Sequence, residues 1–390
     1  MSDYSHDKEQ YFNWNGKIIQ NKYIFIKKLG HGAFASVWLT FDIINKKLFA
    51  VKIHNINDYD YGVKEYLLYK KFNDLNIPHI LNPIDTFDIN IQENSNEKHY
   101  CIVMELMGCS LYTIIKDAYN KITTEFINKI LIQLFKCTKV LHKNNYVHAD
   151  IKPENILLQG YTEDILNISN TLNTIENDMS KIIQFVESFY VNQNNDSDCK
   201  LSSNTKSHIT LSSDNSYETS DSSDKPHVNY DNIINHPNIF LSDLGSCVNN
   251  TTSSKKYYNT CYYAAPETLL KLECNYKTDM WGIGCTLYEL VTGRILFDPD
   301  IVKNMKTRHH ITQIITSLGD IPSHMKCNSP DSDIFFKKNG IIKGVNELPL
   351  TTIWTKLKTT DCIKKLLFNL LRIDPDDRID STAALELLCA

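Results

Sequence analysis

The chain has 390 residues, a hydrophobic fraction of 42%, a charged fraction of 22% and a formal net charge of −5. This length is enough for one large or two moderate domains with a substantial core. A mildly acidic chain has no general attraction to nucleic acid or to anionic membranes, which argues against both as direct partners.

Eleven cysteines are scattered without a CxxC pair, so neither a zinc ribbon nor a thioredoxin-like redox site is indicated. The N-terminal run MSDYSHDKEQ is polar and has no signal-peptide core. No apolar run approaches the ~18 residues that a membrane span needs. We therefore expect an intracellular protein with reduced thiols, in the cytoplasm and also in the nucleus.

The first globular part of the chain reads as a mainly antiparallel sheet, because residues 23–110 alternate short apolar runs with turns. One helical segment near Val63–Phe72 interrupts it. From about Ser110 the pattern becomes helical, and Thr123 or Thr124 is placed to cap a helix whose apolar face extends to Leu141. The expected strands are Tyr23–Leu29, Val37–Phe41, Leu48–Ile53 and Tyr100–Leu106.

Between about Gly160 and Pro237 the composition shifts to Ser, Asn and Asp. Such a segment has too little apolar surface to offset its ordering entropy, so we expect it to be largely disordered, with one helix around Glu176–Phe189. Two interpretations stay open: a tolerated insertion, or a phosphorylatable arm whose added charge alters partner binding. Globular texture resumes after Asn238.

A glycine-rich turn joins the first two expected strands. Gly30 and Gly32 would let the backbone approach phosphate oxygens closely, and Val37 would then cover an adenine ring. A plain hairpin turn is the alternative. The run lacks the GK[ST] ending of a P-loop, and a strand follows it, which argues against a dinucleotide fold.

The next expected strand carries Lys52 close to Ala50. Burying an ammonium group among apolar neighbours is costly unless the group meets an anion. Phosphate oxygens and the carboxylate of Glu65, on the following helix, would serve. The alternative is a surface lysine on an edge strand.

The strongest signal is the run Tyr146–Leu158, which brings Asp150, Lys152 and Asn155 together in a tight loop. Phosphoryl transfer needs these types: a carboxylate accepts the hydroxyl proton, a cation steadies the migrating group, and an amide oxygen holds a metal. Asp243, after a further expected strand, supplies a second oxygen ligand of the kind Mg²⁺ prefers.

In this order, with Ala265-Pro266-Glu267, Asp279 and Arg378 further on, the motifs resemble the eukaryotic protein kinases from about Tyr23 to Leu388. The resemblance implies the α+β, bilobal protein-kinase fold: a small antiparallel β-sheet N-lobe with one main helix and a larger helical C-lobe. The expected boundaries are an N-terminal extension 1–22, an N-lobe 23–107 and a C-lobe 108–390, interrupted by a low-complexity insert 161–237.

The resemblance also implies ATP and Mg²⁺, or Mn²⁺, as cofactors, with Asp150 as catalytic base and Lys152 on the γ-phosphate. The metal would be held by Asn155 and Asp243. Lys52 would bind the α/β-phosphates and pair with Glu65. Glu267 would pair with Arg378, and Asp279 would brace the catalytic loop. The remaining nucleotide contacts would come from the glycine loop and the hinge: Gly30, Gly32, Val37, Ala50, the gatekeeper Met104, Glu105 and Met107.

Lys152, and Thr260 ahead of Ala265-Pro266-Glu267, are typical of serine/threonine enzymes. The Val37-Trp38-Leu39 run, Asp-Leu-Gly in place of Asp-Phe-Gly, and the long insert resemble the SR-protein kinases of the CMGC group, in which the spacer influences localisation and partners. The divergence and the Asn-, Ile-, Lys- and Tyr-rich composition would suit a protozoan or a large DNA virus.

Two departures concern the substrate. Both arginines usual for the group are missing from Thr260–Ala264, and Lys306–His310 is basic where SR-protein kinases dock arginine-rich substrates on acidic residues. A basic face repels an Arg/Ser tract. The expected partners are protein substrates, with basic or Arg/Ser-rich ones among the options, and the chain is expected to act as a monomer.

Three alternatives remain. A pseudokinase scaffold would keep the fold without the chemistry, although Lys52, Asp150 and Asp243 are all present. A small-molecule kinase of related fold is disfavoured by Ala265-Pro266-Glu267 and Asp279. Dual specificity toward tyrosine is open because Tyr257, Tyr258, Tyr262 and Tyr263 lie in the activation segment.

The chain should be active without phosphorylation of its activation segment. Ala149 replaces the arginine that usually pairs with a phosphorylated segment, and the segment from Asp243 to Glu267 is short. Phosphatase treatment of the purified protein should therefore leave phosphoryl transfer unchanged, and its loss would contradict the prediction.

Overall fold

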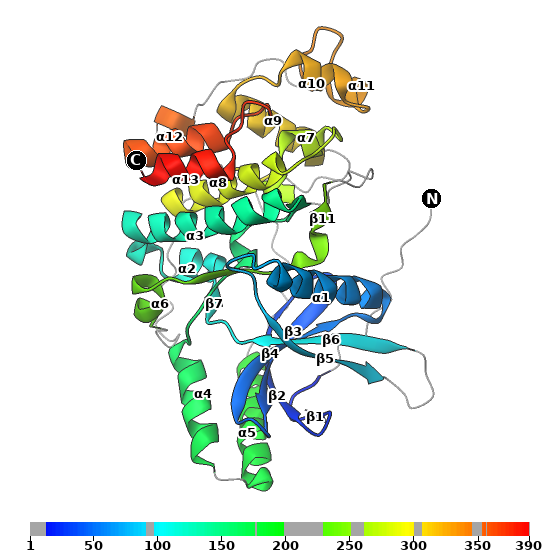
Figure 1. Cartoon of the computed structure of the whole chain (residues 1–390), viewed down its shortest axis with the longest axis vertical. Helices are drawn as coiled ribbons and strands as arrows, with labels where there is room; N and C mark the ends of the chain where they lie inside the picture. The colour runs from blue at the N-terminus through cyan, green and yellow to red at the C-terminus, as the bar shows by residue number, and fades with distance from the viewer. Residues whose placement is uncertain are drawn as a thin grey trace. The chain divides into compact units, whose positions relative to one another are not determined.

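The structure is a computed structural model, and it describes residues 13–90, 97–175, 178–198, 229–250, 261–299, 306–344, 353–355 and 357–389. The chain divides into two compact units (Figure 1). Unit 1 takes in 1–59, 84–106 and 162–229, and unit 2 takes in 60–83, 107–161 and 230–390. Tyr257, Tyr258, Thr260 and the Ser/Asp-rich run at 199–228 lie outside the described residues.

Unit 1 is built on a six-stranded sheet in the order β1-β2-β3-β4-β6-β5. The strand pairs β1–β2, β2–β3, β3–β4 and β4–β6 are antiparallel, as the alternating sequence pattern predicts. A 3₁₀ turn, Ile56–Asp58, follows β4. The strands are β1 (Ile18–Ile19), β2 (Tyr23–His31), β3 (Ala35–Asp42), β4 (Lys47–His54), β5 (Pro83–Asn90) and β6 (Lys98–Glu105).

The core of unit 1 includes residues that precede the expected domain start at Tyr23. Trp14 is 6% exposed and packs with Phe25, Trp38 and Val51 on one face of the sheet. Strand β1 pairs with β2 through Ile18 opposite Ile24. The boundary at residue 23 stays a prediction, and these contacts argue for an earlier one.

The first part of the insert is folded: the helix expected around Glu176–Phe189 is present as the second of two, and the first was not expected. It forms two helices, α4 (Glu163–Thr174) and α5 (Met179–Asp198). Ile165, Ile168 and Leu172 are buried on one face of α4 and share a core with strand residues of β2, β3 and β4. The average composition of the insert hid this helical spacing, because the polar residues lie on the remaining faces.

A salt bridge and a second apolar helix face complete that packing. Lys27 Nζ on β2 lies 2.6 Å from Asp164 Oδ2 on α4. Ile182 and Val186 bring α5 into the same core, and α5 lies beside β2 (Figure 1). Both helices therefore belong to the β-rich unit.

Unit 2 is mainly helical. Its principal helices include α3, capped as expected by the Thr123 hydroxyl, which accepts the Phe126 N–H at 3.1 Å, and the almost wholly buried α8. The longer helices are α1 (Tyr59–Asp74), α2 (Leu111–Asp117), α3 (Thr124–Lys143), α8 (Lys277–Thr292), α9 (Lys306–Leu318), α12 (Asp361–Leu370) and α13 (Ser381–Cys389).

The shorter elements of unit 2 connect these helices. They are the helices α6 (Asp231–Asn235), α7 (Pro266–Leu269), α10 (Ser323–Asn328) and α11 (Ser332–Phe335), and the strands β7 (Cys109–Ser110), β8 (Tyr146–Val147), β9 (Ile156–Leu158), β10 (Ile239–Leu241) and β11 (Val248–Asn249). The 3₁₀ turns are Tyr119–Lys121, Pro153–Asn155, Leu244–Ser246, Cys261–Tyr263 and Ile353–Thr355.

The expected pair of Glu267 and Arg378 is confirmed in the core of unit 2. Both side chains are 1% exposed, and the guanidinium binds the carboxylate twice, at 2.7 and 3.0 Å. Arg378 also donates to the Arg372 and Lys277 carbonyls and lies over the Trp281 ring at 5.1 Å. Because both charges are fully hydrogen-bonded, their burial is tolerated.

In the part of the chain that the structure describes, no helix is both long enough and apolar enough to cross a membrane.

Truncating Leu172 should destabilise unit 1. The side chain is fully buried between α4 and the sheet, so Leu172→Ala should lower the free energy of unfolding by about 3 kcal/mol through lost burial and the cavity left behind. Leu166, on the same helix but 41% exposed, provides the control, and Leu166→Ala should change it by less than about 0.5 kcal/mol. Urea unfolding followed by tryptophan fluorescence measures both, and equal effects would contradict the shared core.

Candidate functional site

The glycine loop lies at the β2–β3 hairpin of unit 1. Gly30 pairs with Val37 across the hairpin, and Gly32 N–H donates to the Ala35 carbonyl at 2.8 Å. Neither glycine has a positive φ, and a Cβ added to either would meet nothing within 4 Å. The local fold therefore does not itself require glycine here, which fits a loop kept free of side chains for an approaching ligand.

Ala50 and Lys52 lie two residues apart on β4 and so face the same side of the sheet. Ala50 is 8% exposed and Val37 packs against the core that includes it and helices α4 and α5. Sequence reasoning missed this connection between the insert and two residues expected to contact adenine. Lys52 belongs to unit 1 and Glu65 to unit 2, so their pairing stays a prediction.

The hinge residues follow directly from β6. Met104 is 6% exposed at the end of that strand, Glu105 is exposed, and Met107 is 8% exposed. Glu65 is fully buried on α1. A buried carboxylate at this position fits the predicted need for a lysine partner.

The catalytic loop is held by one buried carboxylate on α8. Asp279, 1% exposed, accepts hydrogen bonds from the His148 N–H at 2.9 Å and the Ala149 N–H at 2.8 Å, and its Oδ2 lies 2.9 Å from His142 Nε2. Ala149 has φ +67°, a left-handed conformation that is unfavourable for alanine. The expected bracing role of Asp279 matches these contacts.

His148 connects the catalytic loop by hydrogen bonds to the segment that precedes Asp243. The Asp150 N–H donates to His148 Nδ1 at 3.2 Å, so Nδ1 acts as an acceptor and Nε2 carries the proton. Nε2 then donates to the Ser242 carbonyl at 3.0 Å. The ring therefore has a defined tautomer and joins two segments of the site.

Asp150 lies at the centre of the predicted catalytic groups. Lys152 Nζ is 2.7 Å from Asp150 Oδ2, and Asn155 Nδ2 donates to the Asp150 carbonyl at 2.8 Å and to its Oδ2 at 3.1 Å. The Asp150 side chain is 8% exposed and that of Lys152 is 17% exposed. The structure thus brings Asp150, Lys152 and Asn155 together, with a cation and an amide oriented on the carboxylate.

Asn155 and Asp243 lie at one end of an antiparallel strand pair. Strand β9 begins directly after Asn155, and β10 ends at Leu241, paired with Ile156. The Ser242 N–H and hydroxyl both donate to the Asn155 carbonyl, at 2.9 and 3.0 Å. The register therefore brings together the backbones that carry the two predicted metal ligands.

The donor set suits a divalent ion. Asn155 uses its Nδ2 for Asp150, which leaves its amide oxygen as the atom suited to a metal. No group of three or more His, Cys, Asp or Glu side chains that could hold a metal occurs among the described residues. Two protein oxygens with phosphate and water completing the shell is the arrangement that Mg²⁺ favours.

Sequence reasoning missed an acidic group next to the catalytic loop. Glu289, on α8 and 3% exposed, accepts the Tyr263 hydroxyl at 2.7 Å. Burial raises the pKa of Glu289, and the negative charge of Glu154 adds to the rise, while the Tyr263 hydrogen bond partly opposes it. Glu154 itself is exposed. Both carboxyl groups would be stabilised by a cation.

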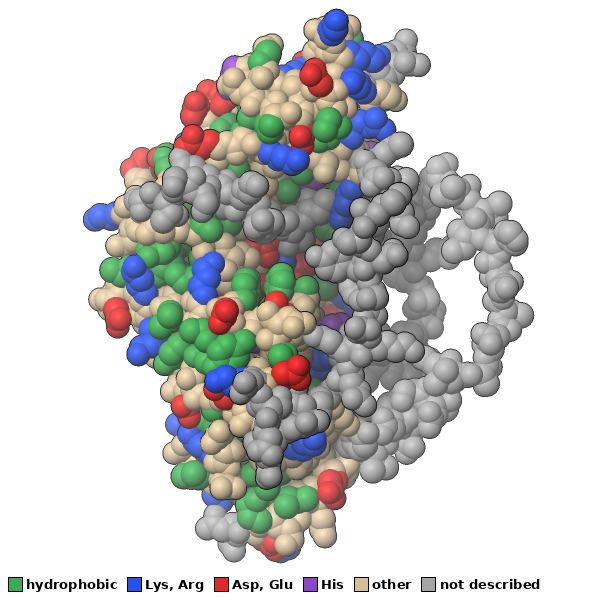
Figure 2. Space-filling model, turned by 90° about the vertical axis from the view of Figure 1, so that its right-hand side faces the viewer, with side chains coloured by type: hydrophobic (Ala, Val, Ile, Leu, Met, Phe, Trp, Pro, Cys, Tyr) green, Lys and Arg blue, Asp and Glu red, His purple; other side chains and the backbone are tan. Residues whose placement is uncertain are grey.

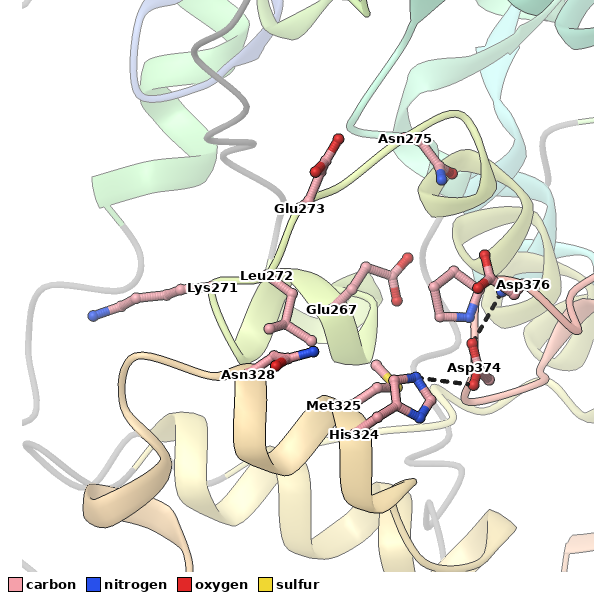
Figure 3. A pocket seen from close by; sticks show the side chains of 11 residues that line it. Glu267, Lys271, Leu272, Glu273, Asn275, His324, Met325, Asn328, Asp374 and Asp376 are labelled. Carbon is pink, nitrogen blue, oxygen red and sulfur yellow. Dashed lines mark hydrogen bonds and ion pairs between the residues drawn. The ribbon is translucent and has the colours of Figure 1, made fainter.

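A separate hollow in unit 2, of about 430 Å³, lies around Glu267 (Figure 3). Figure 3 shows His324 and Asp374 directed toward each other, and their ion pair measures 3.2 Å. Glu267 borders the hollow but is bound to Arg378. None of the predicted catalytic or metal residues lines it, so it is not the phosphoryl-transfer site.

The basic run expected at Lys306–His310 forms the start of α9. Lys306 Nζ lies 5.6 Å from the centre of the Tyr262 ring, and His310 is buried. Lys and Arg side chains gather at the upper end of unit 2, where α10 and α11 lie (Figures 1 and 2). This end of the unit is suited to anionic rather than arginine-rich contacts.

Comparison with known proteins decides the family. The protein kinase domain model matches residues 23–195 and 228–388, most of the chain. This chain belongs to the protein kinase family. A crystal structure of another kinase domain has a TM-score of 0.65 and 25% sequence identity, covering 96% of this chain and 97% of that one. The expected α+β kinase fold is therefore confirmed.

One curated relative of this kinase is serine/threonine-protein kinase AFC1 of Arabidopsis thaliana, with 26% identity over 95% of this chain and 71% of the relative. Another is serine/threonine-protein kinase SRPK of Physarum polycephalum, with 26% identity over 95% of this chain and 86% of the relative. A mimivirus protein described as a serine/threonine-protein kinase is 26% identical over 88% of this chain and 80% of its own length. The likeness to SR-protein kinases is thus confirmed, and the chain is a serine/threonine protein kinase. Its domain implies ATP, a divalent metal ion and protein substrates.

Replacing Glu289 should change how stability depends on pH. The raised pKa means that the folded kinase holds this proton more tightly than the unfolded chain, so the wild type loses stability as the pH rises through the folded-state pKa. Glu289→Gln removes this loss and keeps an acceptor for Tyr263. The difference in unfolding free energy, variant minus wild type, should therefore grow more positive from pH 4 to pH 8, and a flat difference would argue against the raised pKa.

Proposed function

We propose that this kinase transfers the γ-phosphoryl group of ATP to serine and threonine hydroxyls of protein substrates, with Asp150 as the base. The observation that carries the proposal is the braced loop at 148–155. Its backbone is fixed by Asp279, and the Asp150 carboxylate lies between the ammonium of Lys152 and the amide of Asn155. A positioned carboxylate with adjacent cation and amide is the arrangement that this transfer requires.

In this proposal Asp150 accepts the proton of the attacking hydroxyl as the phosphoryl group moves. Lys152, which pairs with Asp150 at 2.7 Å, would turn to the γ-phosphate when substrate is present and lower the local negative charge. Asn155 and Asp243 would hold Mg²⁺, with Mn²⁺ as a substitute, through their side-chain oxygens. The bound ion neutralises phosphate charge in the transition state.

The nucleotide is proposed to lie against unit 1 residues. Gly30 and Gly32 would admit the phosphates, Val37 and Ala50 would contact adenine, and Lys52 would bind the α/β-phosphates. Glu65 would orient Lys52. The hinge contacts would come from Met104, Glu105 and Met107.

For the substrate, we infer a single basic side chain near the target hydroxyl rather than a long Arg/Ser tract. The neighbouring carboxyl groups of Glu154, which is exposed, and Glu289, which is buried, favour a cation close to the catalytic loop, because two negative charges there repel each other. The basic start of α9 disfavours arginine-rich chains there.

We propose that the kinase acts as a monomer in the cytoplasm, and also in the nucleus.

A pseudokinase scaffold is the second candidate. Such a protein keeps the fold without the transfer, and its usual mark is loss of the strand lysine, the catalytic aspartate or the metal aspartate. Lys52, Asp150 and Asp243 are nevertheless all retained. A measurement of phosphoryl transfer therefore distinguishes an active kinase from a pseudokinase scaffold.

Asp150→Ala should lower turnover by roughly 10²–10⁴-fold or more, because the hydroxyl proton loses its acceptor. The assay uses Mg²⁺, labelled ATP and basic, Arg/Ser-rich and acidic peptides, with the fully exposed Asp361→Ala as the control. Peptides with one basic residue should be preferred. Equal transfer by Asp150→Ala, or none by the wild type despite nucleotide binding, would refute the proposed chemistry.

A further inference from the structure

Helix α1 is bonded to the segment that carries the predicted metal aspartate. Tyr69 is fully buried on α1, and its hydroxyl accepts a hydrogen bond from the Asp243 N–H at 3.0 Å. Glu65, the predicted partner of Lys52, lies one turn earlier on the same helix. One side chain thus connects the helix that carries Glu65 with the backbone of Asp243.

The bond holds Asp243 in an unusual conformation. Asp243 has φ +61° and ψ +58°, in the left-handed region that non-glycine residues rarely occupy. Such a conformation persists only where surrounding contacts determine it. Losing the Tyr69 hydroxyl would leave a buried N–H without this acceptor and remove one of the contacts that hold this conformation.

Two further α1 residues fix the other end of the same segment. Lys64 Nζ donates to the Gly245 carbonyl at 2.9 Å, and the Tyr61 hydroxyl lies 3.4 Å from Ser246 Oγ. A Cβ on Gly245 would come within 2.1 Å of the Tyr61 ring, so a larger residue there would displace this ring. The segment 243–246 is therefore attached to α1 at both ends.

We propose that Tyr69 is a positioning residue that holds Asp243 in its metal-binding conformation through α1, an inference that rests on the proposed role of Asp243. The helix and the metal-binding segment then move as one body. The metal site is kept in place by contacts made within unit 2, without an arginine at position 149 to bind a phosphorylated activation segment.

The hydroxyl, rather than the ring, is the deciding group. A phenylalanine would fill the same volume without burying a polar atom, and burying a hydroxyl is costly unless it is hydrogen-bonded. Tyr69 has its partner in the Asp243 N–H. A packing role alone would make the ring sufficient, which makes Tyr69→Phe the informative substitution.

The experiment measures binding of a non-hydrolysable ATP analogue with and without Mg²⁺ to the full chain. Tyr69→Phe should weaken the Mg²⁺-dependent part of the affinity by about tenfold and leave binding without metal unchanged. Tyr66→Phe, on the same helix, is the matched control and should bind as the wild type does. A thermal unfolding scan of each variant checks that it is folded.

A double substitution tests that the effect passes through Asp243. In an Asp243→Ala background, Tyr69→Phe should cause no further loss of Mg²⁺-dependent binding, because coupled residues are not additive. An unchanged Mg²⁺ dependence in Tyr69→Phe, or an equal loss with and without metal, would overturn the inference. A wild type that binds the analogue with Mg²⁺ but transfers no phosphoryl group would refute the proposed function alone.

Discussion

The geometry of the site depends on the carboxylate of Asp279. It is nearly inaccessible to water, yet it receives two backbone N–H groups of the catalytic loop and approaches His142 on α3. Hydrogen bonds to an ionised, buried acceptor are strong, which is why Ala149 can remain in a left-handed conformation. Gly282 on the same helix lets the loop approach further, since a Cβ there would lie 2.8 Å from the Ile151 carbonyl.

Further hydrogen bonds connect the loop held by Asp279 to the backbone of the predicted metal ligands. His148 binds the Ser242 carbonyl, and Ser242 in turn donates twice to the Asn155 carbonyl. One hydrogen-bonded network therefore includes Asn155 itself and the residues that directly precede Asp150 and Asp243. Preorganised groups of this kind need no rearrangement during a reaction, which is how an electrostatic site gains most of its effect.

The sequence predicted those features that depend on local pattern. The four expected strands, the cap at Thr123 and the loop around Asp150 could be read from spacing and residue type. Glu289 and Tyr69 could not, because the carboxyl group and the hydroxyl acquire their roles only from residues distant in the chain, Tyr263 and Asp243. Their own neighbours in sequence give no sign of these contacts.

The prediction for the first part of the insert was incomplete for a related reason. Disorder was inferred from an average over about eighty residues, whereas folding of α4 depends on three apolar side chains meeting a sheet formed by residues far earlier in the chain. That sheet core also contains Ala50, an expected adenine contact, and Leu106, which lies between the expected hinge contacts Glu105 and Met107. Helices α4 and α5 therefore belong to the packed core of unit 1. The interpretation as a phosphorylatable arm stays a prediction, and it concerns the serine- and aspartate-rich sequence that follows α5.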